Sequence, residues 1–137
     1  MLFRRFGTTW HSVTPSFDSR ALSEIAFRKD GARSLPAEEF TRLYQKVGEE
    51  TVGGEAEGSV QSTVEEELLQ RMEAEVSRRL ASLSQGEVMV VENEQGVDFP
   101  KVRDKKKGTI VEGENRLHFE WRVDPPLRLG LYRAVNP

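Results

Sequence analysis

The chain has 137 residues, of which 36% are hydrophobic and 31% charged, and its formal net charge is -3. This length is typical of one domain that buries a core without needing disulfides or metal. The absence of cysteine excludes disulfides, thiolate catalysis, iron–sulfur ligation and thiolate zinc sites. The apolar runs are far shorter than the about 20 residues that cross a membrane, and the start lacks the apolar segment of a secretory signal. We expect a single soluble, cytoplasmic domain.

Charge is segregated along the chain. Residues 1–47 hold eight basic and five acidic residues, residues 48–76 hold one and nine, and residues 77–137 hold eleven and nine. The middle of the chain is therefore an acidic belt between two mildly basic flanks. Such a belt usually forms a solvated helix face and loop, and the alternative is a docking surface for a basic partner.

Aromatic and β-branched residues dominate 1–15, which predicts an N-terminal arm or an edge strand. A second strand is predicted for 21–29, where turn chemistry follows at Asp30-Gly31. A helix is predicted for 36–47, with proline in its first turn and Gly48 after its end. Its apolar residues follow the spacing of an amphipathic helix: Phe40, Leu43, Tyr44 and Val47.

Residues 48–61 are rich in glycine and glutamate, which predicts a flexible acidic loop. The strongest pattern in the chain follows it and predicts a long amphipathic helix over 63–83. The helix begins with capping-box spacing at Ser62 and Thr63. Apolar residues recur at every fourth position to form a stripe that needs a covering sheet: Val64, Leu68, Met72, Val76 and Leu80.

Short strands separated by turn residues are predicted after Gly86, over 87–92, 97–103, 108–112, 116–123 and 127–133. Their short connections favour antiparallel hairpins. In 116–123 the alternation predicts that Leu117, Phe119, Trp121 and Val123 face inward. The predicted fold class is α+β, a single antiparallel sheet of about five to seven strands with both helices packed on one face.

We find no catalytic, cofactor-binding or metal-binding pattern. The histidines His11 and His118 have no ligand spacing, although Glu120 lies near the second in sequence. The paired glutamates lie in first helical turns, where the helix dipole explains them. Nucleophile-elbow, phosphate-loop and dinucleotide motifs are absent from the sequence. We therefore favour a role that is not enzymatic and that uses no cofactor.

Three groups of residues are candidates for binding. The first is a protein interface, because aromatic residues with arginine favour interfaces and the acidic helix adds charge: Phe3, Arg4, Arg5, Phe6, Trp10, Glu65, Glu66 and Glu67. The alternative for the N-terminal aromatic residues, which we slightly favour, is that they belong to a core strand. The second is a basic patch that suits phosphate contacts or simply protects a sheet edge: Lys101, Arg103, Lys105, Lys106 and Lys107. The third is the lining of a pocket between the long helix and the sheet: Tyr44, Met72, Phe119 and Trp121.

The favoured function is a non-catalytic accessory or assembly domain that acts through protein–protein contacts, either by self-association or as a subunit of a larger complex. The first alternative is a small-molecule-binding domain or small enzyme with a pocket between the long helix and the sheet. The second is weak nucleic-acid binding through 101–107. The calculated pI of 5.5 weighs against this last function.

Overall fold

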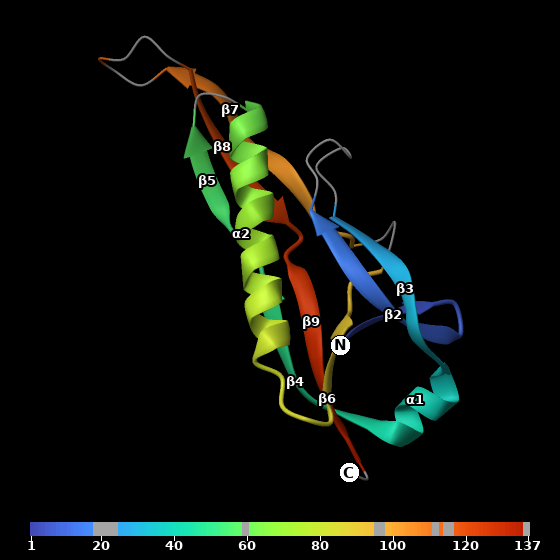
Figure 1. The fold of residues 1–137 in the computed structure, drawn as a ribbon. Helices are drawn as coiled ribbons and strands as arrows, with labels where there is room; N and C mark the ends of the chain where they lie inside the picture. The colour runs from blue at the N-terminus through green and yellow to red at the C-terminus, as the bar shows by residue number, and fades with distance from the viewer. Residues whose placement is uncertain (18–24, 59–60, 95–97, 111–112, 114–116, 136–137) are drawn as a thin grey trace.

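The computed structural model describes residues 1–17, 25–58, 61–94, 98–110, 113 and 117–135, with the backbone alone for 61–63 and 104–110. Along these residues, two helices and nine strands follow one another (Figure 1). Their order is β1 (Leu2–Phe6), β2 (Thr9–Phe17), β3 (Ile25–Pro36), α1 (Ala37–Leu43), β4 (Tyr44–Val52), β5 (Glu55–Gly58), α2 (Gln61–Ala81), β6 (Glu87–Val91), β7 (Lys101–Ile110), β8 (Leu117–Asp124) and β9 (Leu127–Ala134).

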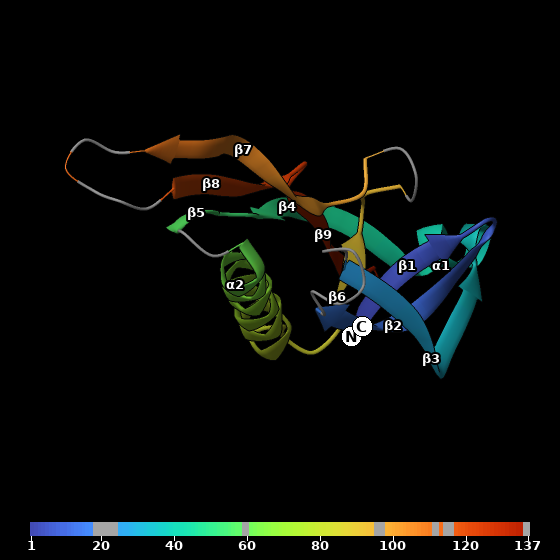
Figure 2. The ribbon, with the colours of Figure 1, turned by 90° about the horizontal axis from the view of Figure 1, so that it is seen from above.

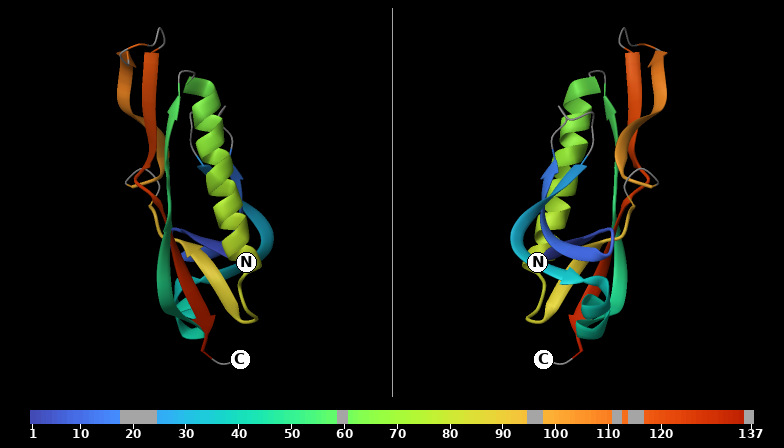
Figure 3. Two further views of the ribbon diagram at one scale, coloured as in Figure 1. Left: turned by 90° about the vertical axis from the view of Figure 1, so that its left-hand side faces the viewer. Right: turned by 90° about the vertical axis from the view of Figure 1, so that its right-hand side faces the viewer.

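The α+β fold class is confirmed, with the described strands in two sheets rather than one. The larger sheet has the order β3-β2-β1-β6-β9-β4 and the smaller one β5-β8-β7. Every pairing is antiparallel except that of β1 with β6, which is parallel. The sheets are joined twice by continuous chain, since β4 leads into β5 and β8 leads into β9, which gives the long ribbon beside α2 in Figures 1 and 3.

The two helices cover opposite faces of the larger sheet, not one face as expected. In β6, Met89 and Val91 belong to the core cluster that contains α2, whereas Val88 and Val90 belong to the cluster that contains α1. Successive strand residues point to opposite faces, so this split follows from the alternation of β6. Such a central strand is apolar on both sides, and Figure 2 shows the helices on different sides of the strands. The apolar run in β6 is the signal for this arrangement.

The long helix is confirmed, with bounds at Gln61 and Ala81 instead of 63 and 83. Its predicted stripe is the most buried part of the helix, since Leu68, Met72 and Val76 each expose 1% of their surface. Val64 and Leu68 contact the smaller sheet, and the later positions contact the larger one. One helix therefore holds both sheets together.

The first helix is shorter than predicted. It begins at Ala37, whose backbone N–H donates to Thr8 O at 2.8 Å, and ends at Leu43. Tyr44 and the three residues after it were predicted to be helical, but they begin β4, in which residues 44–46 pair with β9 and Val47 lies at a register shift. Val47, the last residue of the predicted stripe, is 43% exposed. Pairing along a neighbouring strand outweighs the local helical pattern here, because each ladder bond depends on residues far away in sequence.

The prediction of a flexible acidic loop over 48–61 is wrong for its described part. Residues 48–52 continue β4, and residues 55–58 form β5 against β8. Val52 and Ala56 are buried, whereas the glutamates of these strands are exposed, and Glu50 contacts Arg79 of α2 at 2.6 Å. Gly53 and Gly54 separate the two strands where the chain passes between sheets. The glycine-rich composition of this segment therefore marks the bend between β4 and β5 and not a long loop.

The N-terminal segment is neither an arm nor an edge. β1 has β2 on one side and β6 on the other, so it lies inside the larger sheet. A tight turn at Gly7, where φ is +66°, returns the chain into β2. Phe3 is completely buried as a result. The aromatic residues at this end of the chain reflect core packing on both faces of the sheet.

Candidate functional site

The predicted interface residues separate into core and surface positions. Phe3 is buried in the core and Arg4 is 8% exposed, whereas Arg5 is exposed and Phe6 and Trp10 are half-buried. The three glutamates, of which Glu66 and Glu67 are exposed, lie at the start of α2, where the helix packs on the smaller sheet. Figures 1 and 3 place that end of α2 far from the β1–β2 turn. The predicted interface is therefore not one surface.

The predicted pocket lining does not converge either. Met72 belongs to the cluster under α2, Phe119 and Trp121 pack together at 5.3 Å in the cluster of the smaller sheet, and Tyr44 lies on the opposite face with α1. Met72 and Trp121 expose 1% and 0% of their surface. Packed side chains fill the positions where this pocket was expected between α2 and the sheet.

The basic patch lies on β7, an edge strand of the smaller sheet. Lys101 and Arg103 are exposed, and Arg103 donates to the carbonyl oxygen of Asp124 at 3.1 Å. The side chains of residues 105–107 lie outside the described part. The histidines are separated, because His11 lies on β2 in the larger sheet and His118 on β8 in the smaller one. Within the described residues, no group of three potential metal ligands comes together.

An open groove lies on the sheet face that α1 partly covers, and we call it the aromatic groove. Its volume is about 500 Å³, and its lining comes from β2, α1, β4, β9 and the end of the described chain: Trp10, Phe40, Thr41, Tyr44, Gln45, Lys46, Tyr132 and Val135. Trp10, Tyr132 and Val135 keep substantial exposure, and Val135 is 48% exposed. Apolar surface of large side chains is thus open to solvent at this place.

Phe40 organises the aromatic groove. It is 2% exposed and forms the floor, with the Trp10 ring stacked on it at 4.6 Å and an interplanar angle of 19°. The Tyr44 ring is 5.0 Å away and the Tyr132 ring 5.4 Å away. Tyr44 is fixed further because its hydroxyl accepts a hydrogen bond from Arg33 at 2.8 Å. Offset and edge-to-face pairs of this kind are favourable beyond simple burial, so the rings are held in place before any partner binds.

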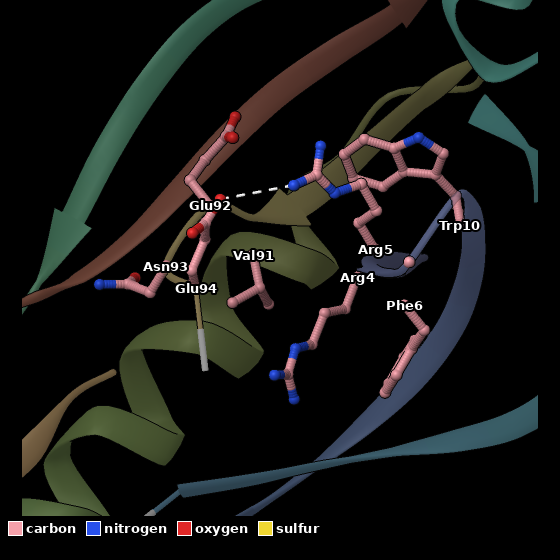
Figure 4. Close-up of a pocket in the computed structure, with 9 residues that line it drawn as sticks. Arg4, Arg5, Phe6, Trp10, Val91, Glu92, Asn93 and Glu94 are labelled. Carbon is pink, nitrogen blue, oxygen red and sulfur yellow. Dashed lines mark hydrogen bonds and ion pairs between the residues drawn. The ribbon is translucent and has the colours of Figure 1, made fainter. Parts of the chain in front are cut away.

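A second hollow, the polar crevice, lies where β1 and β6 end. These parallel neighbours are paired as far as Arg4 and Val91, after which β1 continues to Phe6 and turns into β2, and the chain leaves β6 toward Glu94. The crevice has a volume of about 470 Å³ and is shown in Figure 4. It is lined by Arg4, Arg5, Phe6, Gly7, Trp10, Val91, Glu92, Asn93 and Glu94.

The two arginines of the polar crevice differ in their surroundings. The Arg4 guanidinium lies 5.1 Å from the centre of the Phe6 ring and 5.2 Å from that of Phe99. Its burial lowers the pKa of Arg4 from its usual value. Arg5 points to the other side in Figure 4 and meets Glu94 at 3.4 Å, with 54% and 62% of their side chains exposed. Arg5 is therefore the accessible positive charge of the crevice.

Asn93 builds the wall of the polar crevice and is 3% exposed. Its Nδ2 donates to the carbonyl oxygens of Asp98 and Pro126 at 2.8 and 3.2 Å, and its Oδ1 accepts from the Arg128 N–H at 2.6 Å. The Arg128 guanidinium also contacts the Asp98 carboxylate at 2.7 Å. Burial raises the pKa of Asp98, but the hydrogen bond from Arg128 and other contacts outweigh it and leave the value lowered. This network is structural, because it uses the polar atoms of Asn93 inside the fold.

Glu92 separates the polar crevice from the aromatic groove. Its carboxylate lies over Gly130, where a side chain would collide with it. It contacts Lys46 Nζ at 3.1 Å and accepts a hydrogen bond from the Tyr132 hydroxyl at 3.2 Å. The hydrogen bond to Glu92 raises the pKa of Lys46, and burial followed by the charge of Glu92 raises that of Tyr132. Lys46 and Tyr132 line the groove while Glu92 lines the crevice, so the two hollows share this wall.

No family model matches the chain, and neither the curated proteins nor the solved structures give a significant match. The assignment of a site therefore depends on the geometry described above. Within the described residues, no helix is long and apolar enough to cross a membrane.

Sequence reasoning identified Trp10 and Tyr44 but missed the rest of the groove. Phe40 was assigned only to a helix stripe, and Tyr132 and Val135 were not singled out. Tyr132 alternates with the leucines of β9, which is a detectable sign that both faces of this strand are covered or used. Glu92 and Gly130 carry no sequence signal, because their relation depends on the register of β6 and β9.

Proposed function

We propose that this protein is a non-catalytic accessory or assembly domain that binds another protein through the aromatic groove. The observation that carries the proposal is the gathering of Trp10, Phe40, Tyr44 and Tyr132 from four separate elements around an open hollow of about 500 Å³. Tryptophan, tyrosine and arginine dominate the residues that contribute most to protein binding. In the aromatic groove, Trp10 and Tyr132 stay partly exposed, so a partner protein can reach residues of this kind.

The rigidity of the groove supports the same proposal. Trp10 is stacked on Phe40, and Tyr44 is held by Arg33, so their rotamers are fixed in the unbound chain. Binding then costs less conformational entropy than it would if these side chains had to be ordered by the partner. Val135 at the rim is the most exposed apolar side chain of the lining and is a suitable first contact.

A small-molecule-binding role is the second candidate. It is supported by the volumes of the polar crevice and the aromatic groove, about 470 and 500 Å³, which fall within the range of ligand sites. Nucleic-acid binding through residues 101–107 is a weaker candidate, supported by five basic residues in that stretch. Salt-dependent affinity that is lost on replacing Lys105, Lys106 and Lys107 by alanine would identify it. We also infer a cytoplasmic location, which the cysteine-free sequence supports.

The proposal is tested by selecting a phage library of random dodecapeptides on the immobilised full chain. We expect enriched peptides with large apolar residues, whose affinity falls at least about tenfold in Val135→Asp, because a charge at the rim must be desolvated. Val47→Asp is the matched control, since Val47 is also an exposed valine, 43% against 48%, but does not line the groove.

Two results would contradict the proposal: failure to enrich any peptide, or equal loss of binding in the two valine variants. Light scattering of the wild-type chain measures its mass in solution and so tests for self-association. A mass that is a multiple of 15.6 kDa and falls to that value in Val135→Asp would identify the partner as a second copy of the chain.

A further inference from the structure

We propose that the bound protein segment carries an acidic side chain next to its apolar anchor, and that this carboxylate takes the place of Glu94 on Arg5 in the polar crevice. The inference rests on the proposed function, because it adds the chemistry of the partner to the aromatic groove. Three observations support it: the two hollows share a wall, the Arg5 guanidinium is accessible, and its present partner in the fold, Glu94, forms only a weak, exposed ion pair with it.

The two hollows are adjacent because Trp10 lines both. Arg5 is the direct partner of Trp10 across the β1–β2 ladder, and directly opposed residues share one face of a sheet. Figure 4 shows the Arg5 side chain on the same side as the Trp10 ring. A segment that covers Trp10 therefore passes Arg5, and residues adjacent in its sequence can reach both.

The internal Glu94–Arg5 pair indicates which group fits there. Glu94 is a carboxylate held at 3.4 Å from Arg5, with both side chains more than half exposed. Exposed pairs of this type contribute little to stability, so exchanging one carboxylate for another costs little. A partner carboxylate that is desolvated against Trp10 makes a stronger hydrogen bond with the same guanidinium.

A basic partner residue fits this place poorly. Glu92 already contacts Lys46 and the Tyr132 hydroxyl, so its charge is compensated inside the fold. A cation that paired with Glu94 would lie beside the Arg5 guanidinium and meet its repulsion, whereas an anion is attracted to it.

The sequences of the selected dodecapeptides and their affinities test the inference. We expect aspartate or glutamate within about three residues of the apolar anchor, the reach of an extended chain of about 10 Å. We expect Arg5→Gln to weaken an enriched peptide about tenfold, as the loss of a hydrogen bond to a charged group does. Glu94→Gln should strengthen it several-fold, because the internal competitor is then neutral.

Arg78→Gln is the matched control for Arg5→Gln. Arg78 is an exposed arginine in an exposed pair with Glu75 at 2.8 Å, on α2 and not in either hollow. Its removal should leave peptide affinity unchanged. The inference is overturned if the enriched peptides lack acidic residues, if Arg5→Gln and Arg78→Gln act alike, or if Glu94→Gln weakens binding. In each of these cases the proposed function stands as long as binding still depends on Val135, so the two failures are distinguishable.

Discussion

Replacing Gly130 by alanine tests how the wall between the two hollows is built. A methyl group there would overlap the Glu92 carboxylate and lie 2.8 Å from Cε1 of Tyr132. Glu92 can rotate away only by giving up its contacts with Lys46 and the Tyr132 hydroxyl. A partly exposed ion pair contributes up to about 1 kcal/mol and a hydrogen bond about 1 kcal/mol.

The gain from replacing glycine in a strand offsets this loss by about 0.5 kcal/mol. We therefore expect Gly130→Ala to lower the free energy of unfolding by about 1 to 2 kcal/mol. The cost should be smaller in a Glu92→Ala background, because the colliding carboxylate is gone and only the close contact with the Tyr132 ring remains. This difference between backgrounds is the coupling energy of a double-mutant cycle.

Urea unfolding of the four proteins, followed by tryptophan fluorescence, measures the cycle. Trp10 in the larger sheet is half-buried and Trp121 in the smaller sheet is fully buried, so the fluorescence of these two residues reports the unfolding of both sheets. The reasoning would be refuted if Gly130→Ala lowered the free energy of unfolding equally in the wild-type and Glu92→Ala backgrounds. The clash would then be with the Tyr132 ring or the backbone, and the carboxylate would have no fixed place over Gly130.

Leu68→Ala should cost about 2 to 4 kcal/mol in urea unfolding, because this side chain is 1% exposed. Glu57→Lys should raise the melting temperature slightly, because Glu57 and Glu120 are directly opposed like charges that cost a few tenths of a kcal/mol. The pKa of Glu87 is lowered below its usual 4.5, first by a hydrogen bond from the backbone N–H of Ser84 and second by one from the Arg133 guanidinium. Its stabilisation is therefore present above that pH and lost as the pH falls through the lowered pKa; urea titrations at pH 7 and pH 3 should show a smaller pH-dependent loss in Glu87→Gln than in wild type. Charge reversal of residues 65–67 to lysine should leave dodecapeptide affinity within about twofold, since these glutamates lie on α2 and outside both hollows.

The long helix was predictable because its signal is local. The apolar stripe from Val64 to Val76 recurs with the period of the helix itself, and all four positions are buried. The alternation of β8 was predictable for the same reason, and Trp121 and Val123 do face inward. Leu117, at the start of that strand, is nevertheless 46% exposed. β7 and β8 extend past the end of α2 there, so no helix covers it (Figure 3).

The chain from Tyr44 to Gly58 was not predictable from local pattern. Its helical spacing and its acidic, glycine-rich composition both argue against strands, yet it forms β4 and β5. The deciding interactions are ladders with β9 and β8, which begin about 60 residues or more further along the chain. Composition describes how a segment behaves alone and does not include the hydrogen bonds that distant strands supply.

The candidate site was predictable only in part, for a related reason. Trp10 and Arg5 were identified because aromatic residues beside arginine stand out in sequence. Phe40, Tyr132 and Glu92 join them through the packing of α1 and the register of β9 with β6. A groove assembled from five separate segments leaves no motif, since each segment contributes only one to three side chains.

The two faces of the larger sheet explain why the aromatic groove, rather than the acidic helix, is the better contact surface. On one face α2 has 21 residues and buries its apolar stripe from Val64 to Val76, so its outer face carries solvated charges such as Glu66 and Glu67. Burying those charges against a partner would require their desolvation. On the other face α1 has only seven residues and leaves Trp10, Tyr132 and Val135 open. The short helix is thus the structural cause of the groove: had α1 continued to Val47 as its apolar spacing predicts, Tyr44 would not begin the edge strand that forms one wall.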